Sequence, residues 1–248
     1  MKVLIAAPLR QEIKIFREYQ AGLDRLIVPE GVTVDRYFVV NDCPEVIPEI
    51  RDADYDVLDT GDTFRKADND HLWTQENLEK MPALRNMTVR RALEGGYDYL
   101  FSVDTDIVLH PETLTRLLEA DKDIISELFW TNGWCNAWMY DQSSGMTKAW
   151  VRPGLYQVGM TGACTLIKRE VLAEGVDFTP IPNIRKALWG EDRWFCIRAA
   201  VLGFEMWIDT YCPPWHLYSE KEYQNFMARR AEDAERDQNG PENQNEYL

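Results

Sequence analysis

Short apolar runs alternate with amphipathic stretches from the first residues of the chain onward. Runs rich in β-branched residues predict buried strands, and apolar residues three and four apart predict helices. The pattern predicts strands over residues 2–8, 34–42, 53–61, 99–106, 122–130 and 205–210, helices over 13–23, 81–94 and 191–203, a helix opened by Pro111, and a strand that runs into a helix over 162–172. This alternation is typical of an α/β fold with a doubly wound, mainly parallel sheet and helices on both faces.

Polar and glycine-rich stretches divide the chain without marking a long linker or a repeat. Residues 62–80 are charged and predict a loop. Gly95 and Gly96 end the predicted helix over residues 81–94. We expect one domain over residues 1–220, made of two halves, 1–106 and 107–220. Residues 221–248 are polar and predict a solvated helical tail that ends in disorder-like composition.

Acidic and amide side chains end several predicted strands. Asn41 and Asp42 end the second strand, and Asp104 and Asp106 end the strand over 99–106. Ligands of mainly parallel sheets gather at the carboxyl ends of strands, so this edge is the expected site. Side chains two apart in extended chain face the same side, and two close carboxylates require a cation or a raised pKa. Mg²⁺ or Mn²⁺ would satisfy both, although Asp106 capping a turn beside a solvated Asp104 also explains the spacing.

Three later stretches add candidate chemistry. Residues 158–172 place small residues at Gly162 and Ala163, where backbone can approach a ligand. Glu191 and Asp192 begin a predicted helix, where acidic residues are also favoured by the helix dipole. His216 lies in a predicted loop after the last strand, where it is either a ligand or a structural histidine.

In this order, the motifs resemble those of nucleotide-sugar glycosyltransferases of the GT-A fold. The sequence is similar to the inverting family that includes cellulose and hyaluronan synthases. It also resembles the Anp1-like mannosyltransferases through "APLR" at residues 7–10, "LRN" at 84–86, "VDTDIV" at 103–108 and the segment 159–178. The resemblance covers about residues 1–220 in motif order, and it implies a nucleotide-binding half over residues 1–106 and an acceptor-binding half over residues 107–220. The "GED" at 190–192 fits the inverting family better, so the stereochemical outcome is open.

The resemblance implies a role for each motif. An enzyme of this kind transfers a sugar from a nucleoside diphosphate sugar, UDP- or GDP-linked, to an acceptor hydroxyl with the help of Mn²⁺ or Mg²⁺. The expected metal ligands are Asp104, Asp106 and His216, and the expected catalytic residues are Asp192 as general base and Glu191 beside it. The expected nucleotide contacts are Ala7, Pro8, Arg10, Asp42, Arg85, Asn86, Asp104 and Thr105. For Arg85, a solvated helical arginine is the alternative.

Tryptophans cluster in residues 129–140. The spacing of Trp130, Trp134 and Trp138 fits one face of a helix, but the Asn–Gly at 132–133 favours a loop. Flat rings stack well on sugars, so Trp130, Trp134 and Trp189, with Gly162 and Ala163, are the expected sugar and acceptor contacts. Ordinary core packing is the alternative for these rings.

Composition narrows the function classes further. The 248 residues carry a net charge of −15, which disfavours nucleic acid and anionic lipid as partners. No apolar run is long enough to span a membrane, and the five cysteines are scattered, so we expect a reduced, cytoplasmic protein. A nucleotidyltransferase of similar fold is the main alternative, but residues 6–14 lack the expected glycine-rich phosphate loop. A non-catalytic sugar-nucleotide-binding protein is another, and the acceptor stays open among glycan, small molecule, peptide and lipid-linked sugar.

Overall fold

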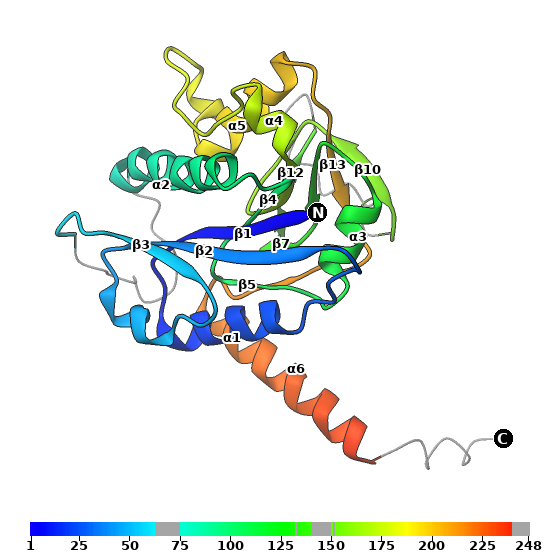
Figure 1. Ribbon diagram of the computed structural model, residues 1–248. Coiled ribbons are helices and arrows are strands. Elements are labelled where there is room, and N and C mark those ends of the chain that lie inside the picture. The colour runs from blue at the N-terminus through cyan, green and yellow to red at the C-terminus, as the bar shows by residue number, and fades with distance from the viewer. Residues whose placement is uncertain (63–74, 132, 140–149, 151, 240–248) are drawn as a thin grey trace.

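The computed structural model describes residues 1–62, 75–131, 133–139, 150 and 152–239 of the chain. An eight-stranded sheet crosses the molecule in the order β10-β13-β6-β12-β4-β1-β2-β3 (Figure 1). Its strands are β1 (Lys2–Leu9), β2 (Thr33–Asn41), β3 (Asp54–Leu58), β4 (Tyr99–Val103), β6 (Ile124–Glu127), β10 (Leu155–Val158), β12 (Cys164–Lys168) and β13 (Met206–Asp209). Neighbours among β1 to β4 are parallel, as are β6 and β13, whereas β12 runs antiparallel between β4 and β6 and β10 runs antiparallel at the edge.

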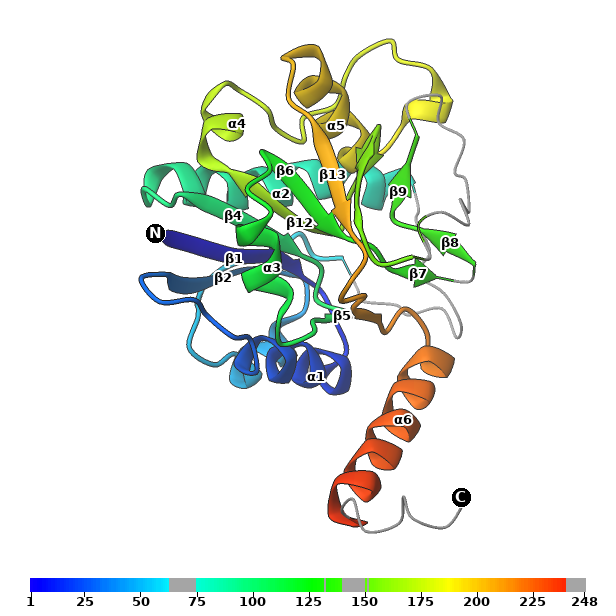
Figure 2. The same ribbon diagram turned by 90° about the vertical axis from the view of Figure 1, so that its right-hand side faces the viewer.

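Helices cover both faces of this sheet. They are α1 (Ile13–Asp24), α2 (Gln75–Glu94), α3 (Thr113–Glu119), α4 (Arg169–Ala173), α5 (Glu191–Val201) and α6 (Glu220–Asn239), with short 3₁₀ turns η1 (Pro44–Glu49) and η3 (Lys186–Leu188). Apolar residues of α2, α4 and α5 form the core on one face, and residues of α1 and α3 form the core on the other. Figures 1 and 2 show these two layers on opposite sides of the strands. The expected doubly wound, mainly parallel α/β sheet is confirmed.

Short paired strands surround the carboxyl end of the sheet. They are β5 (Ile107–Val108) with β14 (Trp215–His216), β7 (Trp130–Thr131) with β8 (Trp134–Cys135), and β9 (Ala137–Trp138) with β11 (Met160–Thr161). The antiparallel β5–β14 pair joins the chain just after β4 to the chain just after β13. It therefore brings two distant parts of the sequence to one place.

Element boundaries differ from the expected ones where local chemistry is ambiguous. Helix α2 begins at Gln75, so residues 75–80 are not the loop that we expected, and residues 63–74 of that loop lie outside the described residues. Pro82 therefore lies inside the helix. Helix α3 begins at Thr113, two residues after Pro111. The tryptophan-rich segment forms the short strands β7, β8 and β9 and not a helix, in agreement with the Asn–Gly pair that argued against a helix. Tyr140 lies outside the described residues.

The C-terminal helix α6 extends away from the rest of the molecule (Figure 2). Its first turns pack Tyr223, Phe226 and Met227 against a small cluster that includes Ile15 and Leu217. The described residues contain no helix with the length and apolar character needed to cross a bilayer. Residues 240–248, the expected disorder-like end of the tail, lie outside the described residues.

Candidate active site

The turn after β4 carries Asp104 and Asp106, and the two aspartates have different partners. The strand ends at Val103, and the Ile107 N–H then donates to the Asp104 carbonyl oxygen over 3.0 Å. The extended chain that we expected over residues 104–106 is therefore not formed, because this hydrogen bond closes a turn. The Asp104 carboxylate pairs with an arginine, and the Asp106 carboxylate pairs with a histidine.

Asp106 and His216 lie together although they are 110 positions apart in the sequence. The Asp106 Oδ2 is 3.4 Å from the His216 Nε2. The β5–β14 pairing places His216 opposite Ile107, and the Leu217 N–H donates to the Asp106 carbonyl oxygen over 2.7 Å. Neighbouring ligand atoms of a six-coordinate Mg²⁺ or Mn²⁺ lie about 3 Å apart. The pair therefore fits two positions of such a cation.

The third expected metal ligand, Asp104, points elsewhere. Its carboxylate accepts from the Arg85 guanidinium, with its oxygens 2.9 and 3.2 Å from Nη2. Among the described residues, Asp104, Asp106 and His216 do not bring one ligand atom each within 4.8 Å of one another. The structure thus brings together two of the three residues and ties the third to an arginine.

Arg85 forms the centre of a buried ionic cluster. The residue is 2% exposed, and α2 directs it to three carboxylates. Besides Asp104, its Nε lies 3.4 Å from a Glu191 oxygen and 3.9 Å from an Asp192 oxygen, and its Nη1 donates to the Ser102 hydroxyl over 3.3 Å. A buried guanidinium needs such partners, because an unpaired charge in the interior is very costly.

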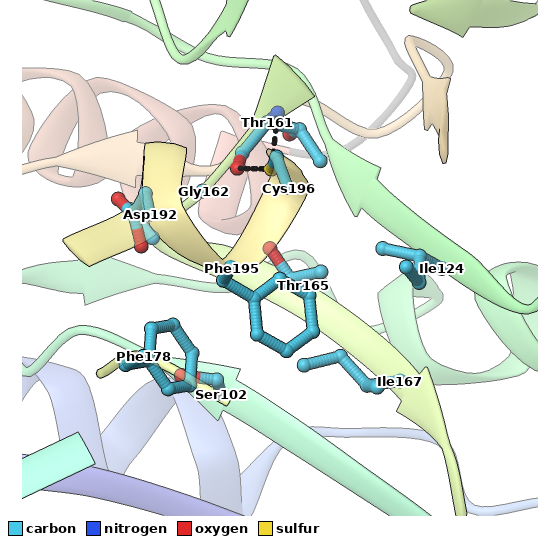
Figure 3. A pocket seen from close by; sticks show the side chains of 11 residues that line it. Ser102, Ile124, Thr161, Gly162, Thr165, Ile167, Phe178, Asp192, Phe195 and Cys196 are labelled. Carbon is cyan, nitrogen blue, oxygen red and sulfur yellow. Dashed lines mark hydrogen bonds between the residues drawn. The ribbon is translucent and has the colours of Figure 1, made fainter. Parts of the chain in front are cut away.

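Asp192 lies in the first turn of α5 and packs against the backbone of Gly162. A Cβ at residue 162 would overlap the Asp192 carboxyl group, so only glycine fits there. Figure 3 shows both residues beside a small cavity between α5 and the sheet. Apolar and hydroxyl side chains line the rest of it, among them Ser102, Thr161, Thr165, Phe178, Phe195 and Cys196. The close approach that we expected at Gly162 is made by the side chain of Asp192.

The electrostatics of the site favour a proton on Asp192 more than usual. Burial raises the pKa of Asp192 to about 7, and the negative charges of Glu191 and Asp104 act in the same direction against the opposing charge of Arg85. Burial also raises the pKa of Asp104, despite its ion pair with Arg85. A carboxyl group with a pKa near neutrality is suited to accept and release protons.

The imidazole of His216 is affected by two opposing causes. Burial lowers its pKa, but the charge and hydrogen bond of Asp106 outweigh that effect, so the pKa of His216 is raised overall. Its Nδ1 is hydrogen bonded to the Thr131 hydroxyl of β7. This contact orients the ring and leaves Nε2 toward Asp106.

Polar residues at the ends of β1 and β2 form a separate group. Arg10 pairs with Asp62 over 3.1 Å, and Asp42 accepts hydrogen bonds from the backbone and hydroxyl of Thr60. Burial would raise the pKa of Asp42, but these hydrogen bonds outweigh it and the pKa is lowered. Ala7 and Pro8 end β1 beside this group, Ala7 buried and Pro8 half-buried.

Three of the expected nucleotide contacts are buried or hydrogen bonded within the protein. Asn86 donates to the Thr179 hydroxyl over 3.0 Å and accepts from the Phe178 N–H over 2.9 Å, which fastens α2 to the segment after α4. Thr105 is buried within the turn. Arg85 is neither the solvated arginine of the alternative interpretation nor open to a ligand.

The tryptophans divide into packed and exposed rings. Trp130 and Trp138 pack on the core, and the Arg193 guanidinium lies over the Trp138 ring. Trp134 is 64% exposed and Trp189 is 41% exposed. In the β7–β8 pair, Trp134 stands opposite Thr131, the residue that contacts His216. Trp134 is thus placed close to the Asp106–His216 pair.

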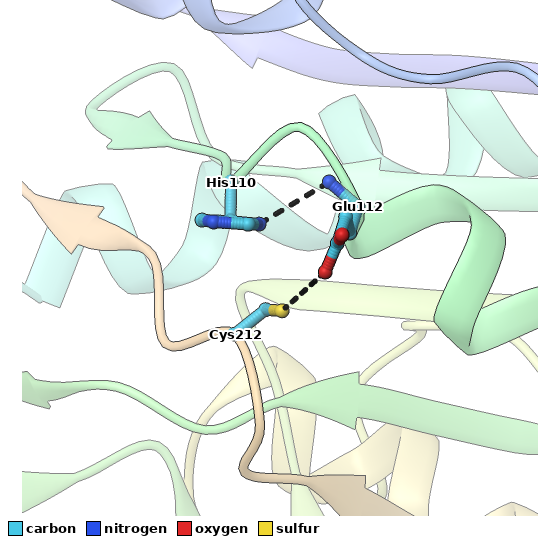
Figure 4. A group of neighbouring side chains, drawn as sticks. All are labelled: His110, Glu112 and Cys212. Carbon is cyan, nitrogen blue, oxygen red and sulfur yellow. Dashed lines mark hydrogen bonds between the residues drawn. The ribbon is translucent and has the colours of Figure 1, made fainter.

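A second group of potential ligands lies in the chain segments after β5 and after β13, next to the start of α3. His110, Glu112 and Cys212 bring one ligand atom each within 4.8 Å (Figure 4). The Nδ1 of His110 already accepts the Glu112 N–H over 3.2 Å, and the Cys212 thiol lies 3.9 Å from the Glu112 carboxylate. Burial and the negative charges of Glu127, Glu112 and Asp209 raise the pKa of the Cys212 thiol to about 11, against the opposing charge of Arg116, so the thiol keeps its proton and is a poor metal ligand. We assign this group no part in the site.

Sequence reasoning missed the central position of Arg85, and one signal for it was present. Leu84, Thr88 and Ala92 mark the buried face of α2, and Arg85 lies next to that face in the same turn. A charged residue inside an apolar stripe is unusual and requires partners. The hydroxyl of Thr131 was also missed, and no local pattern distinguishes it.

Comparison with known proteins finds solved structures of similar fold. No protein-family model matches the sequence, and no curated protein matches it. Residues 1–349 of TarS from S. aureus in complex with UDP align with a TM-score of 0.58 and 14% identity, over 86% of this chain and 59% of that one. The same protein in complex with UDP-GlcNAc gives a TM-score of 0.52 and 13% identity, over 86% and 57%.

A third solved structure holds a metal ion. The mannosyltransferase PcManGT from Pyrobaculum calidifontis, in complex with GDP-Man and Mn²⁺, aligns with a TM-score of 0.53 and 13% identity, over 85% of this chain and 56% of that one. The chain thus spans less than two thirds of the length of each of these neighbours. The likeness shows the fold. It is the expected GT-A-like α/β fold.

Proposed function

We propose that the chain is a metal-dependent glycosyltransferase that moves a sugar from a UDP- or GDP-linked donor to an acceptor hydroxyl, with inversion at the anomeric carbon. One observation carries the proposal. Asp106 and His216 lie 3.4 Å apart, and Arg85 pairs both with Asp104 of the same turn and, over 3.9 Å, with the carboxyl group of Asp192. The glycosyltransferase-like fold and the UDP, UDP-GlcNAc and GDP-Man complexes of its structural neighbours support it.

Asp106 and His216 are the side chains that would hold Mn²⁺ or Mg²⁺. Their oxygen and nitrogen atoms suit Mn²⁺ well, and a cation with two protein ligands keeps positions open for phosphate oxygens. When bound, the dication neutralises the charge that develops on the leaving nucleoside diphosphate. Thr131 orients the imidazole for this role through its hydrogen bond. Asp104 pairs with Arg85 in this structure and adds negative charge to the same turn.

Asp192 is the group that would take the proton of the acceptor hydroxyl. The acceptor oxygen forms its bond to the anomeric carbon while the bond from that carbon to the diphosphate oxygen breaks. The hydroxyl proton passes to Asp192, and the electron pair leaves with the nucleoside diphosphate. A base with a pKa near 7 is matched to this task, and base catalysis contributes about 10²–10⁴-fold.

We choose the proposed donor and acceptor contacts among residues at the ends of β1 and β2 and among the exposed tryptophan rings. We propose that Arg10 and Asp42, at the ends of β1 and β2, contact the nucleotide, and that Ala7 and Pro8 shape its pocket. The exposed rings of Trp134 and Trp189 would stack on donor or acceptor sugar. The acceptor is proposed only as a molecule that presents a free hydroxyl.

A donor panel tests the function. Released nucleotide is measured with UDP-glucose, UDP-GlcNAc and GDP-mannose, in Mn²⁺ and in EDTA, and binding is measured by isothermal titration. We expect one donor to bind and to be cleaved slowly in Mn²⁺, and neither signal in EDTA. Turnover that is unchanged in EDTA would contradict the metal site. Pyrophosphate release from a nucleoside triphosphate and a sugar phosphate would instead indicate a nucleotidyltransferase.

A further inference from the structure

Arg85 is shared between two carboxylates that the proposed reaction uses for different tasks. Asp104 belongs to the turn beside the donor cation, and Asp192 is the proposed base. The first comes from the end of β4 and the second from the first turn of α5, so the guanidinium of α2 is the connection between them.

The contacts of Arg85 use each nitrogen of the guanidinium. Nη2 binds Asp104, Nη1 donates to Ser102, and Nε faces Glu191 and Asp192. The Phe178 ring lies 5.6 Å from the guanidinium carbon and closes one of its faces. With 2% of the residue exposed, no phosphate can reach the guanidinium without disrupting this cluster.

The charges around Arg85 do not balance within the cluster. One positive group serves three carboxylates, and the contacts with Asp104 are shorter than the contact with Asp192 by about 1 Å. Carboxylates that compete for one cation are coupled, since a gain of positive charge near one releases the guanidinium for the others. The Asp104 side of the cluster adjoins the Asp106–His216 pair, where positive charge would arrive.

From this geometry we infer that Arg85 is a positioning residue that links donor loading to the placement of the base. The inference rests on the proposed function. When a donor and its dication occupy the Asp106 side, Asp104 shares its charge with them, and Arg85 draws Asp192 closer and fixes it toward the acceptor hydroxyl. Arg85 itself does not contact the donor. Asp192 therefore reaches its catalytic position only after the donor has bound.

Arg85→Lys tests this inference against a matched control, Arg90→Lys, an exposed arginine on the same helix. Lysine keeps the charge but lacks the planar fork that reaches two carboxylates at once. We expect donor affinity in Mn²⁺ to stay within about threefold of wild type and kcat to fall about 100-fold, as misplacement by about 1 Å does in other enzymes. Arg90→Lys should change neither quantity.

The measurement separates positioning from binding. Titration calorimetry gives the donor Kd, and released nucleotide gives kcat and KM with the donor that wild type accepts. A loss of donor affinity that equals the loss of kcat would make Arg85 a donor ligand and overturn the inference. Unchanged kcat would overturn it as well.

A second variant covers the case in which Arg85→Lys does not fold. Phe178→Leu removes the ring beside the guanidinium and leaves every buried charge paired. We expect kcat to fall about fivefold with donor Kd unchanged. If kcat is also unchanged in this variant, the inference is wrong. If wild type cleaves no donor of the panel, the proposed function fails first and the inference falls with it.

Discussion

Asp104 and Asp106 are one residue apart in the sequence but belong to clusters with opposite properties. Asp104 is part of the arginine-centred cluster (Arg85, Asp104, Glu191 and Asp192), and Asp106 is part of the histidine-centred pair (Asp106 and His216). A guanidinium keeps its charge at every pH that a protein tolerates, whereas an imidazole can lose its proton and bind a metal ion. The comparison shows that two aspartates of one motif need not be equivalent ligands.

The difference follows from which elements meet each carboxylate. Helix α2 supplies a permanent cation to Asp104, and β14 supplies a neutralisable one to Asp106. A dication can displace a proton from His216, but it must compete with Arg85 for Asp104. We therefore propose the histidine-centred pair as the part of the site that takes a metal, and the arginine-centred cluster as the part that contains the proposed base.

The largest effect is expected from Asp192→Asn, which removes the base and leaves the metal side intact. We expect kcat to fall by at least about 100-fold, because an asparagine side chain cannot accept the proton of the acceptor hydroxyl. The donor Kd in Mn²⁺ should stay within about threefold of wild type, because Asp192 belongs to the other cluster. Calorimetry and a released-nucleotide assay measure the two quantities.

Glu174→Gln is the matched control for Asp192→Asn, since Glu174 is an exposed acid that ends a short helix away from both clusters. It should leave both values unchanged. Full turnover in Asp192→Asn would show that another group accepts the acceptor's proton. Loss of donor binding would show that Asp192 also contributes to the donor site, so that the two clusters do not act separately.

A smaller effect is expected from exchanging one aspartate at a time. Asp106→Asn should weaken Mn²⁺-dependent donor binding about 100-fold, because it removes a carboxylate from the dication. Asp104→Asn should weaken that binding less but lower the free energy of unfolding by about 3 kcal/mol, because Arg85 loses a close partner in a buried ion pair.

Titration calorimetry and urea unfolding measure the two losses on the same preparations. Each variant serves as the control of the other, because both remove one charge from the same turn. Equal losses of affinity and equal losses of stability in the two variants would contradict the distinction between the clusters.

The pH profile should show a tenfold effect per pH unit below neutrality. With its pKa at about 7, Asp192 is largely protonated below that pH and cannot accept a proton. We expect kcat/KM at saturating Mn²⁺ to rise tenfold per unit up to about pH 7 and to level off above it. The donor Kd is measured at each pH, since protonation of His216 would weaken metal binding independently. If the rise of kcat/KM with pH persists unchanged in Asp192→Asn, another group must cause it.

Much of the fold could be predicted from the sequence because its signals are local. Apolar runs and helix periodicity predicted the strands of the main sheet, with the exception of the edge strand β10. The reversed direction of β12 has no local signal, since pairing between β4 and β6 depends on residues far apart in the chain. The same holds for β5 and β14, whose pairing brings His216 to Asp106.

The site could be predicted less completely, because side-chain partners depend on tertiary structure. Motif order predicted Asp106, His216 and Asp192 as site residues, and their roles stay predictions. In the structure, Asp106 lies 3.4 Å from His216, and Asp192 lies 3.9 Å from the arginine that pairs with Asp104. The roles of Arg85 and Asn86 differ from the expected nucleotide contacts, because helix α2 turns both residues inward. Their position in an amphipathic helix was visible, but which carboxylates would meet them was not.

The smallest expected effect is on stability, and it is opposite in sign to the effect on activity. Because the pKa of Asp192 is raised from 3.8 to about 7, the folded state binds more protons than the unfolded state between these values, and stability is lost as the pH rises through that window. Asp192→Asn cannot ionise, and Arg85 keeps two other carboxylates. We expect its melting temperature to match wild type near pH 4 and to exceed it by about 5 °C at pH 8. A lower melting temperature at pH 8 would mean that the Asp192 charge stabilises the arginine-centred cluster, and the base would then have to be sought outside it.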